Sequence, residues 1–495
     1  MFFNKTMFIA AAASLLFGSA AARAQDSGAL LDLLVRKGLI NDQEAEEVRA
    51  DLIKENASTA AGKLKLSTPV TELELYGDAR LRYEVRSGKT GSPDTINPPG
   101  DTVQRDRARY RLRIGLRGTL VDDWLFGIRL ETSTNPRSTN VTFGDDTGVN
   151  GPYSKDSDRI SVGQAYLGYR GIRDLTLTAG KMPNPFVTTT MVWDPDINPE
   201  GIAEQFKHTF NFSVGGGSSS NAGGATMSAD GKSMVASTPP AEPTKISLEL
   251  FANFAQFVYD DTNPENPVGP SPAGVPTNDS YMLGWQVGAK VNFPHNLYFQ
   301  LAPTLYNYTG YGDNLYGPFV GDPTFVNAQG NKVTPNQTGV NNLLVFDIPM
   351  ELGWKFGELP VRIFGEYAHN FSGADRARAA GHPDKTSEVH AYQIGAGLGK
   401  LKEKHTWELR GFWQHAEQFS LDPNLVDSDI FDSRVNMEGF AFYFGYQITD
   451  AVYASLTYAH GWQVDTSLGT GGVGDLGINP VTDYNLFQAD LGFKF

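Results

Sequence analysis

The carboxy-terminal segment of this chain alternates strictly between apolar residues and residues that are polar or glycine. Its apolar positions are every second residue, namely Phe487, Ala489, Leu491, Phe493 and Phe495. Successive side chains of a β-strand point to opposite faces, so the segment predicts a strand with one apolar face and one water-facing face. A chain with many such strands has to cover every apolar face, which leaves few architectures open.

The same period of two recurs from Glu72 to the end of the chain. Sixteen segments of this kind are predicted, near 71–86, 105–120, 122–135, 159–170, 173–183, 206–215, 245–258, 281–293, 296–308, 341–356, 359–371, 388–400, 404–419, 436–448, 451–463 and 482–495. Bacterial single-chain membrane barrels use even strand numbers, with about 9–11 residues of each strand in the membrane. The pattern therefore predicts an all-β fold, a transmembrane antiparallel β-barrel of about 16 strands, over residues 71–495.

The predicted connections alternate between tight turns and long polar loops, which is the asymmetry of transmembrane barrels. The turns fall at 121–123, 171–172, 294–295, 357–358 and 449–450. The long loops fall at 87–104, 136–158, 184–205, 259–280, 309–340, 372–387, 420–435 and 464–481, all on the outer side. Segment 216–244 breaks the alternation, and its Gly/Ser-rich composition predicts an insertion. A soluble sandwich or propeller is the alternative, because it also covers one face of each strand.

The first 70 residues differ from the rest. Residues 1–24 combine a basic Lys5, a short apolar run and an Ala22-Arg23-Ala24 motif, which predicts a secretory signal peptide. Residues 25–62 carry apolar residues at helical spacing and predict a short N-terminal amphipathic helical segment in the periplasm. This segment is either a spacer or a coil that associates subunits or contacts the cell wall. Residues 63–70 are predicted to be a linker.

The composition excludes several classes of protein. The chain carries a net charge of −15 at pH 7, and loss of Lys5 and Arg23 would make it more acidic, which argues against nucleic acid as a partner. There is no cysteine, and no apolar run after residue 24 is long enough to form a membrane-spanning helix. The eight histidines show no spacing typical of a metal centre or a catalytic triad. No catalytic residue, metal or cofactor is therefore predicted, although an outer-membrane hydrolase remains an alternative.

A row of arginines marks the second predicted strand. The row comprises Arg105, Arg107, Arg109, Arg111, Arg113 and Arg117, and Arg80, Arg82, Arg129 and Arg170 are expected beside it. Most residues between them are apolar, and an arginine facing lipid near the midplane costs about 2–4 kcal/mol, so the arginines are expected to line the pore. A cationic strip favours anions. Alternatively, the row pairs with acidic residues of neighbouring strands and stiffens the wall, and both can hold together; the candidate partners are Glu72, Glu74, Glu84 and Glu131.

The third long loop contains alternating polar residues and two prolines, which hold the segment extended. The candidate residues are Trp193, Asp194, Asp196, Asn198 and Glu200. They could form a constriction inside the barrel, an ordinary surface loop or a calcium site. The calcium pattern fails after Asn198, because Pro199 stands where an EF-hand loop needs glycine and Gln205 where it needs glutamate.

The chain resembles the bacterial outer-membrane putative porin family, in the style of phosphate-selective porins. The likeness covers roughly 72–495 and is carried by Gln164–Arg170, Leu177–Phe186, Trp193–Gly201 and Leu491–Phe495. It implies a passive diffusion channel, assembled as a homo-oligomer such as a trimer, in a Gram-negative outer membrane. In many porins the third loop narrows the pore, which favours a constriction here. The last strand resembles the insertion element that the barrel-assembly machinery recognises, which would be Phe487, Leu491, Phe493 and Phe495.

The sequence therefore predicts a water-filled porin for small hydrophilic solutes or ions, exported through the periplasm into outer-membrane lipid, with a preference for anions. The runner-up is a non-conducting barrel that serves as an adhesin or structural anchor. A plugged lumen would favour that alternative.

Overall fold

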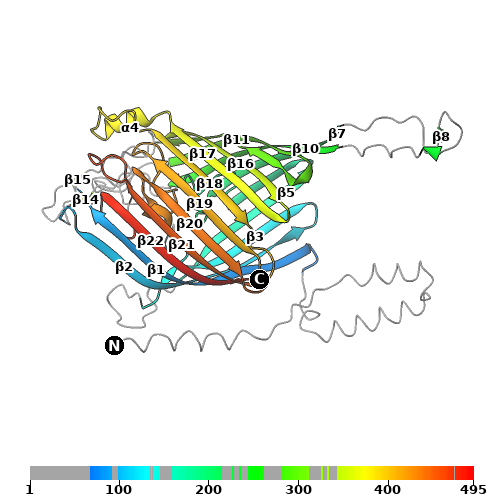
Figure 1. Cartoon of the computed structure of the whole chain (residues 1–495), viewed down its shortest axis with the longest axis horizontal. Coiled ribbons are helices and arrows are strands. Elements are labelled where there is room, and N and C mark those ends of the chain that lie inside the picture. Colours follow the sequence, from blue (N-terminus) through cyan, green and yellow to red (C-terminus); the bar gives the residue numbers. More distant parts are fainter. Residues whose placement is uncertain are drawn as a thin grey trace. The chain divides into compact units, whose positions relative to one another are not determined.

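In the computed structural model of the chain, the strands form a barrel (Figure 1). The structure describes residues 67–91, 98–133, 135, 138–144, 159–214, 226–227, 234–235, 244–260, 280–310, 325–326, 332–333, 343–472 and 474–495. The predicted signal peptide, the predicted helical segment and the first half of the linker, residues 63–66, lie outside the described residues. Residues 69–495 form one compact unit.

One antiparallel sheet makes up this unit. Its strands are β1 (Val70–Thr90), β2 (Thr102–Leu120), β3 (Trp124–Thr132), β4 (Val141–Thr142), β5 (Ile160–Ile172), β6 (Leu175–Lys181), β7 (Glu200–Val214), β10 (Thr244–Asp260), β11 (Ser280–Asn292), β12 (Tyr298–Leu301), β13 (Thr304–Gly310), β16 (Leu344–Phe356), β17 (Leu359–Asn370), β18 (His390–Gly399), β19 (Trp407–Ala416), β20 (Met437–Gln447), β21 (Val452–Gln463) and β22 (Val481–Lys494). Within the described ranges they form a closed barrel of 16 strands, because β12 and β13 share one position and β4 continues β3.

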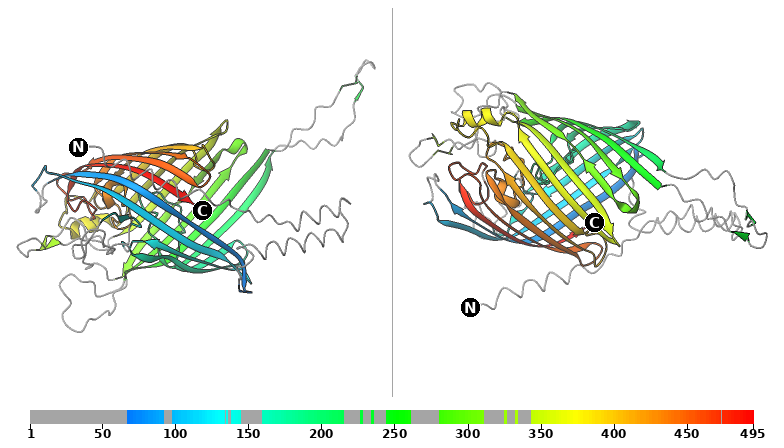
Figure 2. Two further views of the ribbon diagram at one scale, coloured as in Figure 1. Left: turned by 90° about the horizontal axis from the view of Figure 1, so that it is seen from below. Right: turned by 45° about the horizontal axis from the view of Figure 1, so that its top comes forward.

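The barrel closes where the first strand meets the last. β1 pairs with β22 from Asp78 opposite Lys494 to Thr90 opposite Val481, and with β2 on its other side. The blue and red strands lie side by side in Figure 1 and again in Figure 2. Closure leaves no unpaired backbone edge, which is the condition for placing a sheet in lipid. The predicted fold class is thus confirmed, and each predicted segment overlaps an observed strand.

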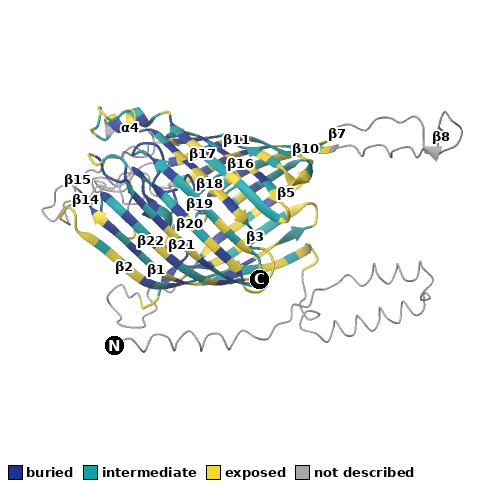
Figure 3. Ribbon diagram, viewed as in Figure 1, coloured by how far each residue is buried: buried dark blue, intermediate teal, exposed yellow. Residues whose placement is uncertain are grey.

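Side chains alternate around this wall as the period of two requires. Large apolar residues such as Leu81, Ile114 and Phe442 are 43–53 % exposed on the outer face, whereas the intervening residues are mostly polar and buried (Figure 3). The exposed residues match the apolar band that meets lipid in membrane barrels. The membrane-facing and lumen-facing phases of the strands follow directly from the sequence.

The connections also follow the predicted asymmetry. Short connections include 121–123, 173–174 and 357–358, where Asp122, Asp174 and Gly357 have φ near +60°. The turn expected at 171–172 lies two residues later, because β5 continues to Ile172. At the other end lie the long connections, one of which contains helix α4 (Gly373–Ala379). No described helix is long and apolar enough to cross a membrane.

The described residues also include small elements of secondary structure outside the main barrel strands. The predicted insertion at 216–244 contains a ladder of β8 (Thr226–Met227) with β9 (Met234–Val235), and the rest of it lies almost wholly outside the described residues. A second ladder joins β14 (Phe325–Val326) to β15 (Lys332–Val333). Single turns of 3-10 helix occur at η2 (Pro294–Asn296) and η5 (Ile430–Ser433).

Candidate functional site

Two long connections fold into the barrel and fill much of its interior at the long-loop end. They are residues 182–199 between β6 and β7, called the first inner loop, and residues 417–436 between β19 and β20, called the second inner loop. Every residue of 418–426 and 431–436 is buried. The loops contact each other, because the Asp194 amide donates to the Leu425 carbonyl at 2.6 Å and the Asp427 amide to the Thr190 carbonyl at 3.2 Å.

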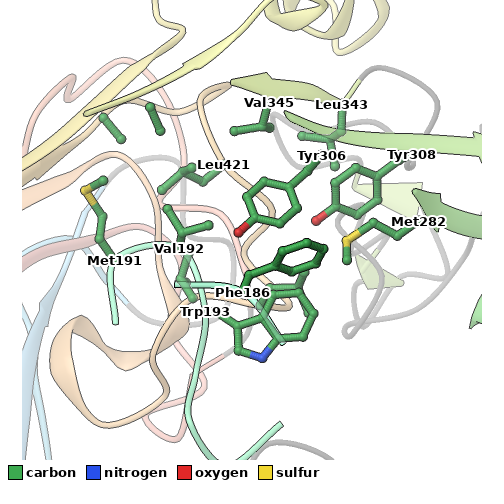
Figure 4. Close-up of a cluster of buried hydrophobic side chains, with 14 of the residues drawn as sticks. Phe186, Met191, Val192, Trp193, Met282, Tyr306, Tyr308, Leu343, Val345 and Leu421 are labelled. Atoms are coloured by element: carbon green, nitrogen blue, oxygen red, sulfur yellow. The ribbon is translucent and has the colours of Figure 1, made fainter. Parts of the chain in front are cut away.

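Apolar side chains pack the first inner loop against the wall. The Phe186 ring meets the Tyr306 ring edge-on at 5.5 Å between centroids, and the Trp193 ring lies 6.4 Å from that of Phe257. Figure 4 shows Phe186 and Trp193 together beside Tyr306 and Tyr308, with Leu421 of the second inner loop nearby. Burying each such side chain contributes about 1.5–3 kcal/mol, so this cluster holds the loop inside the barrel.

Hydrogen bonds from inward-facing wall residues add to this packing. The Gln286 side chain accepts from the Val187 amide at 3.0 Å and donates to the Val187 carbonyl at 2.8 Å. The Glu366 carboxylate accepts from the Thr188 hydroxyl at 3.2 Å, the Thr189 amide at 3.0 Å and the Thr189 hydroxyl. Gln286 and Glu366 are 0–2 % exposed, so these bonds are shielded from water.

The predicted arginine row lies on the inner face of the wall. Arg107, Arg109 and Arg111 are 5–8 % exposed, while Ile114 in the opposite phase is 43 % exposed. Almost every guanidinium of the row has a carboxylate partner. Arg111 and Arg113 share Asp78 at 2.8 and 2.7 Å, Arg107 pairs with Glu84 and Asp475, Arg82 with Asp490 and Asp429, and Arg129 with Glu131.

Arg80 and Arg109 have weaker ionic partners. Arg80 donates to the Asn140 side chain at 2.7 Å and lies 3.7 Å from Asp490, whereas Arg109 donates to Ser138 and to the Asn140 carbonyl. Of the four glutamates expected as partners, Glu84 and Glu131 pair with the row, Glu74 pairs with Arg117, and Glu72 makes no ion pair with any described residue. The arginine row therefore works partly as wall structure.

Several partners of the arginines come from loops. Asp196 of the first inner loop lies 3.4 Å from Arg113, and Asp429 of the second inner loop 2.7 Å from Arg82. Asp475, in the connection from β21 to β22, contacts Arg107. The arginines of β1 and β2 thus bind three separate loops to one side of the wall.

The segment predicted as a constriction is only partly brought together. Trp193, Asp194 and Asp196 lie in the first inner loop, and Ser428 donates its amide to Asp194 at 2.9 Å. Asn198 accepts from Gln164 of β5 at 2.9 Å. Glu200 instead begins β7, where its side chain is 62 % exposed and pairs with Lys181. Among the described residues, no group of three or more His, Cys, Asp or Glu side chains has the arrangement of a metal site.

The loop carboxyls differ sharply in their environments. Burial raises the pKa of Asp194, and the neighbouring carboxylates of Asp427 and Asp196 raise it further. Burial together with Asp429 raises the pKa of Asp427 to about 7. Burial also disfavours the charged form of Asp429, but Arg82 and Arg86 outweigh it and lower the pKa of Asp429. The two inner loops therefore meet at a group of acids, part neutral and part ion-paired.

Sequence reasoning missed the second inner loop, which was expected to be an outer loop. Its apolar residues are the pattern that could have revealed it, because a water-exposed loop has no need of Leu421, Leu425, Val426, Phe431 and Val435. These side chains are 0–9 % exposed and pack within the barrel. The connection from β21 to β22 was missed for the same reason, since Leu468 and Ile478 are 0–2 % exposed.

A cavity remains beside the inner loops. A cavity of about 490 Å³ is bounded by the first inner loop at Thr188–Thr190 and the second at Asp427–Ile430, and by the wall on the other sides. Its charged lining residues are Arg80, Arg82, Arg362, Arg410, Glu351, Asp427, Asp429 and Asp490. Tyr443, Tyr453, Ser455 and Gln488 supply further polar groups.

Comparison with known families decides what kind of barrel this is. A family model described as "Putative porin" matches residues 11–320, more than half of the chain. The chain belongs to this porin family. It is accordingly an outer-membrane β-barrel of the channel type, as predicted, and its apolar outer face meets outer-membrane lipid.

Solved structures similar to this porin are also outer-membrane proteins. In-vitro folded OmpT, an outer membrane protein of Vibrio cholerae, is 11 % identical with a TM-score of 0.40, over 87 % of this chain and 99 % of that one. The outer membrane channel DcaP of Acinetobacter baumannii is 12 % identical with a TM-score of 0.38, over 87 % and 99 %. OprB of Pseudomonas putida is 9 % identical with a TM-score of 0.41, over 86 % and 94 %. No curated protein sequence matches the chain.

Proposed function

We propose that this porin is a passive diffusion channel for small hydrophilic solutes or ions, with a preference for anions and no catalytic activity. The observation that carries the proposal is the polar cavity of about 490 Å³ inside the closed wall, bordered by both inner loops. Water and small solutes need such a polar route, because the outer face of the barrel is apolar. The first inner loop would serve as the narrowing element.

The proposed anion preference depends on which arginines lack a carboxylate partner, rather than on the number of arginines. Arg410 has no carboxylate within ion-pair distance among the described residues and lies over the Tyr443 ring at 4.9 Å. The Arg410 guanidinium therefore keeps donors free for a passing anion, whereas Arg82, Arg107 and Arg111 are occupied by carboxylates.

A second candidate follows from the packing of the inner loops. Their apolar cluster and ion pairs resemble a plug, and a plug would favour a non-conducting barrel that serves as an adhesin or structural anchor. Single-channel conductance of the folded protein in a planar bilayer separates the two. Ohmic steps with an anion-selective reversal potential support the channel, and silence from inserted protein supports the anchor.

The proposal includes the partners expected from the sequence. The terminal strand β22 would be recognised by the barrel-assembly machinery, and its outward-facing Phe487, Leu491 and Phe495 are 40–52 % exposed, as such recognition requires. Phe493 is half-buried in the same strand. The porin is also proposed to assemble as a homo-oligomer, for example a trimer. Chemical cross-linking in native membranes tests this assembly, and recovery of monomer alone after cross-linking would refute it.

A further inference from the structure

Four of the eight histidines of this chain lie on one outward-facing patch at the long-loop end of the barrel. They are His369 of β17, His390 of β18, His415 of β19 and His460 of β21. Each is next to an alanine that is 0–1 % exposed inside the barrel, namely Ala368, Ala391, Ala416 and Ala459. Because strand side chains alternate, the four imidazoles point outward, away from the proposed channel.

Two of these imidazoles are in unusually close contact. His369 and His390 are directly opposite in the pairing of β17 with β18, and their Nδ1 atoms are 3.2 Å apart. The Nδ1 atom of His390 is also 2.8 Å from the hydroxyl of Tyr367. A ring nitrogen carries either one hydrogen or one lone pair, so Nδ1 of His390 cannot form a full hydrogen bond with both neighbours. Hydrogen bonding within the protein does not fully explain this arrangement.

The spacing of the two nitrogens fits a shared metal ion. Zinc binds imidazole nitrogen at about 2.0–2.1 Å in tetrahedral geometry, which places two such nitrogens roughly 3.3 Å apart. The Tyr367 hydroxyl is an oxygen ligand next to one of these nitrogens, 2.8 Å from Nδ1 of His390. The Glu417 carboxylate is close by, because it accepts from the His390 backbone amide at 2.7 Å and interacts electrostatically with His369. Imidazole nitrogens with oxygen ligands suit zinc, copper or nickel rather than calcium or magnesium.

We propose that His369 and His390 bind one divalent late transition-metal ion on the outer rim of the barrel, with Tyr367 and water completing the coordination. Glu417 positions the site by holding the start of β18. The ion would join β17 to β18 where the 371–389 connection begins and ends, beside the first residue of the second inner loop. The site is independent of the proposed channel, since neither histidine faces the lumen.

One of the other two histidines of the patch, His460, provides a matched control. Nδ1 of His460 lies 3.0 Å from the Asn485 side chain, and Nδ1 of His415 lies 2.8 Å from Glu438. Neither has a second imidazole nitrogen within hydrogen-bond distance among the described residues. A histidine-to-alanine change at His460 therefore removes an outward imidazole of the same patch without touching the proposed ligands.

The test is a metal titration of the folded, tag-free protein after treatment with a chelator. Zinc binding by calorimetry is expected at one ion per chain, and copper added in its place should show nitrogen coupling in its electron paramagnetic resonance spectrum. His369→Ala and His390→Ala should each weaken zinc binding at least about tenfold, and His460→Ala should not. The shift of folded barrels on unheated gels verifies that each variant is folded.

Two outcomes would overturn the inference. One is the absence of zinc binding in the folded wild type. The other is equal binding by wild type and the His369→Ala/His390→Ala double variant, which would place the ion elsewhere. Neither outcome bears on conductance, so failure of the metal site and failure of the channel are distinguishable.

Discussion

Replacing Gln286 by leucine should loosen the first inner loop and enlarge the pore. Gln286 is fully buried and makes two hydrogen bonds to Val187, one to its amide and one to its carbonyl. Leucine has a similar volume but leaves both backbone groups without a partner. A buried unpaired polar group costs about 1–3 kcal/mol, so the seated loop should lose roughly 3 kcal/mol. That loss raises the ratio of displaced to seated loop about a hundredfold.

Planar-bilayer recording measures this change directly. Displacement of a loop that fills the lumen should produce more frequent transitions to a state of higher conductance, and more open-channel noise. The matched control is Gln414→Leu, because Gln414 is also buried and lumen-facing but accepts from Gln393 of the neighbouring strand rather than from the loop. If Gln286→Leu gave the same conductance and noise as Gln414→Leu and the wild type, the first inner loop would not be the narrowing element.

Three further predictions concern charge, pH and assembly. Replacing Arg109, Arg111 and Arg113 by glutamine leaves Asp78 and Asp196 without their arginine partners. The reversal potential in a salt gradient should therefore shift toward cation preference. An unchanged reversal potential would mean that the arginine row has a structural role only. Because the pKa of Asp427 rises from 3.8 to about 7 in the packed loops, their stability should fall as pH rises through that window, and high-conductance transitions should become more frequent. Asp427→Asn should weaken this pH dependence, and Asp427→Asn with Asp194→Asn should abolish it, because burial also raises the pKa of Asp194; a wild-type pH dependence in the double variant would assign it to another group. Phe495→Ala should lower the yield of folded barrel on unheated gels, because Phe495 covers Gly77 at the closing pair of strands, and a wild-type yield would argue against that role.

The strands were predictable because their periodicity is local. An outward apolar residue and an inward polar residue alternate wherever the wall separates lipid from water, as in β2 and β22. The largest error was β7, which was expected to begin near residue 206 but begins at Glu200. Its inward Ala203 is fully buried beside the first inner loop. In the missed part of β7, Glu200 and Glu204 occupy outward positions on either side of Ile202, so the apolar face is interrupted and the alternation disappears.

The arginine row likewise has features that the sequence predicts and contacts that it does not predict. Its inward orientation follows from the apolar residues between the arginines, and the pairing with Glu84 and Glu131 was among the alternatives that the sequence offered. The pairing of Arg82 with Asp429 was not, because the two residues are 347 positions apart in the chain. Contacts between distant loops and strands leave no periodic trace in the sequence.

The sequence by itself therefore determined the barrel, the phase of each strand and the face that meets lipid, because each of these depends on alternation within a single segment. Only the tertiary structure decided what fills the lumen. The inner loops enter it because their apolar residues find cover against Tyr306 and Phe257, and because their aspartates meet arginines of β1 and β2. Both conditions exist only after the barrel has closed and brought distant strands around a common interior.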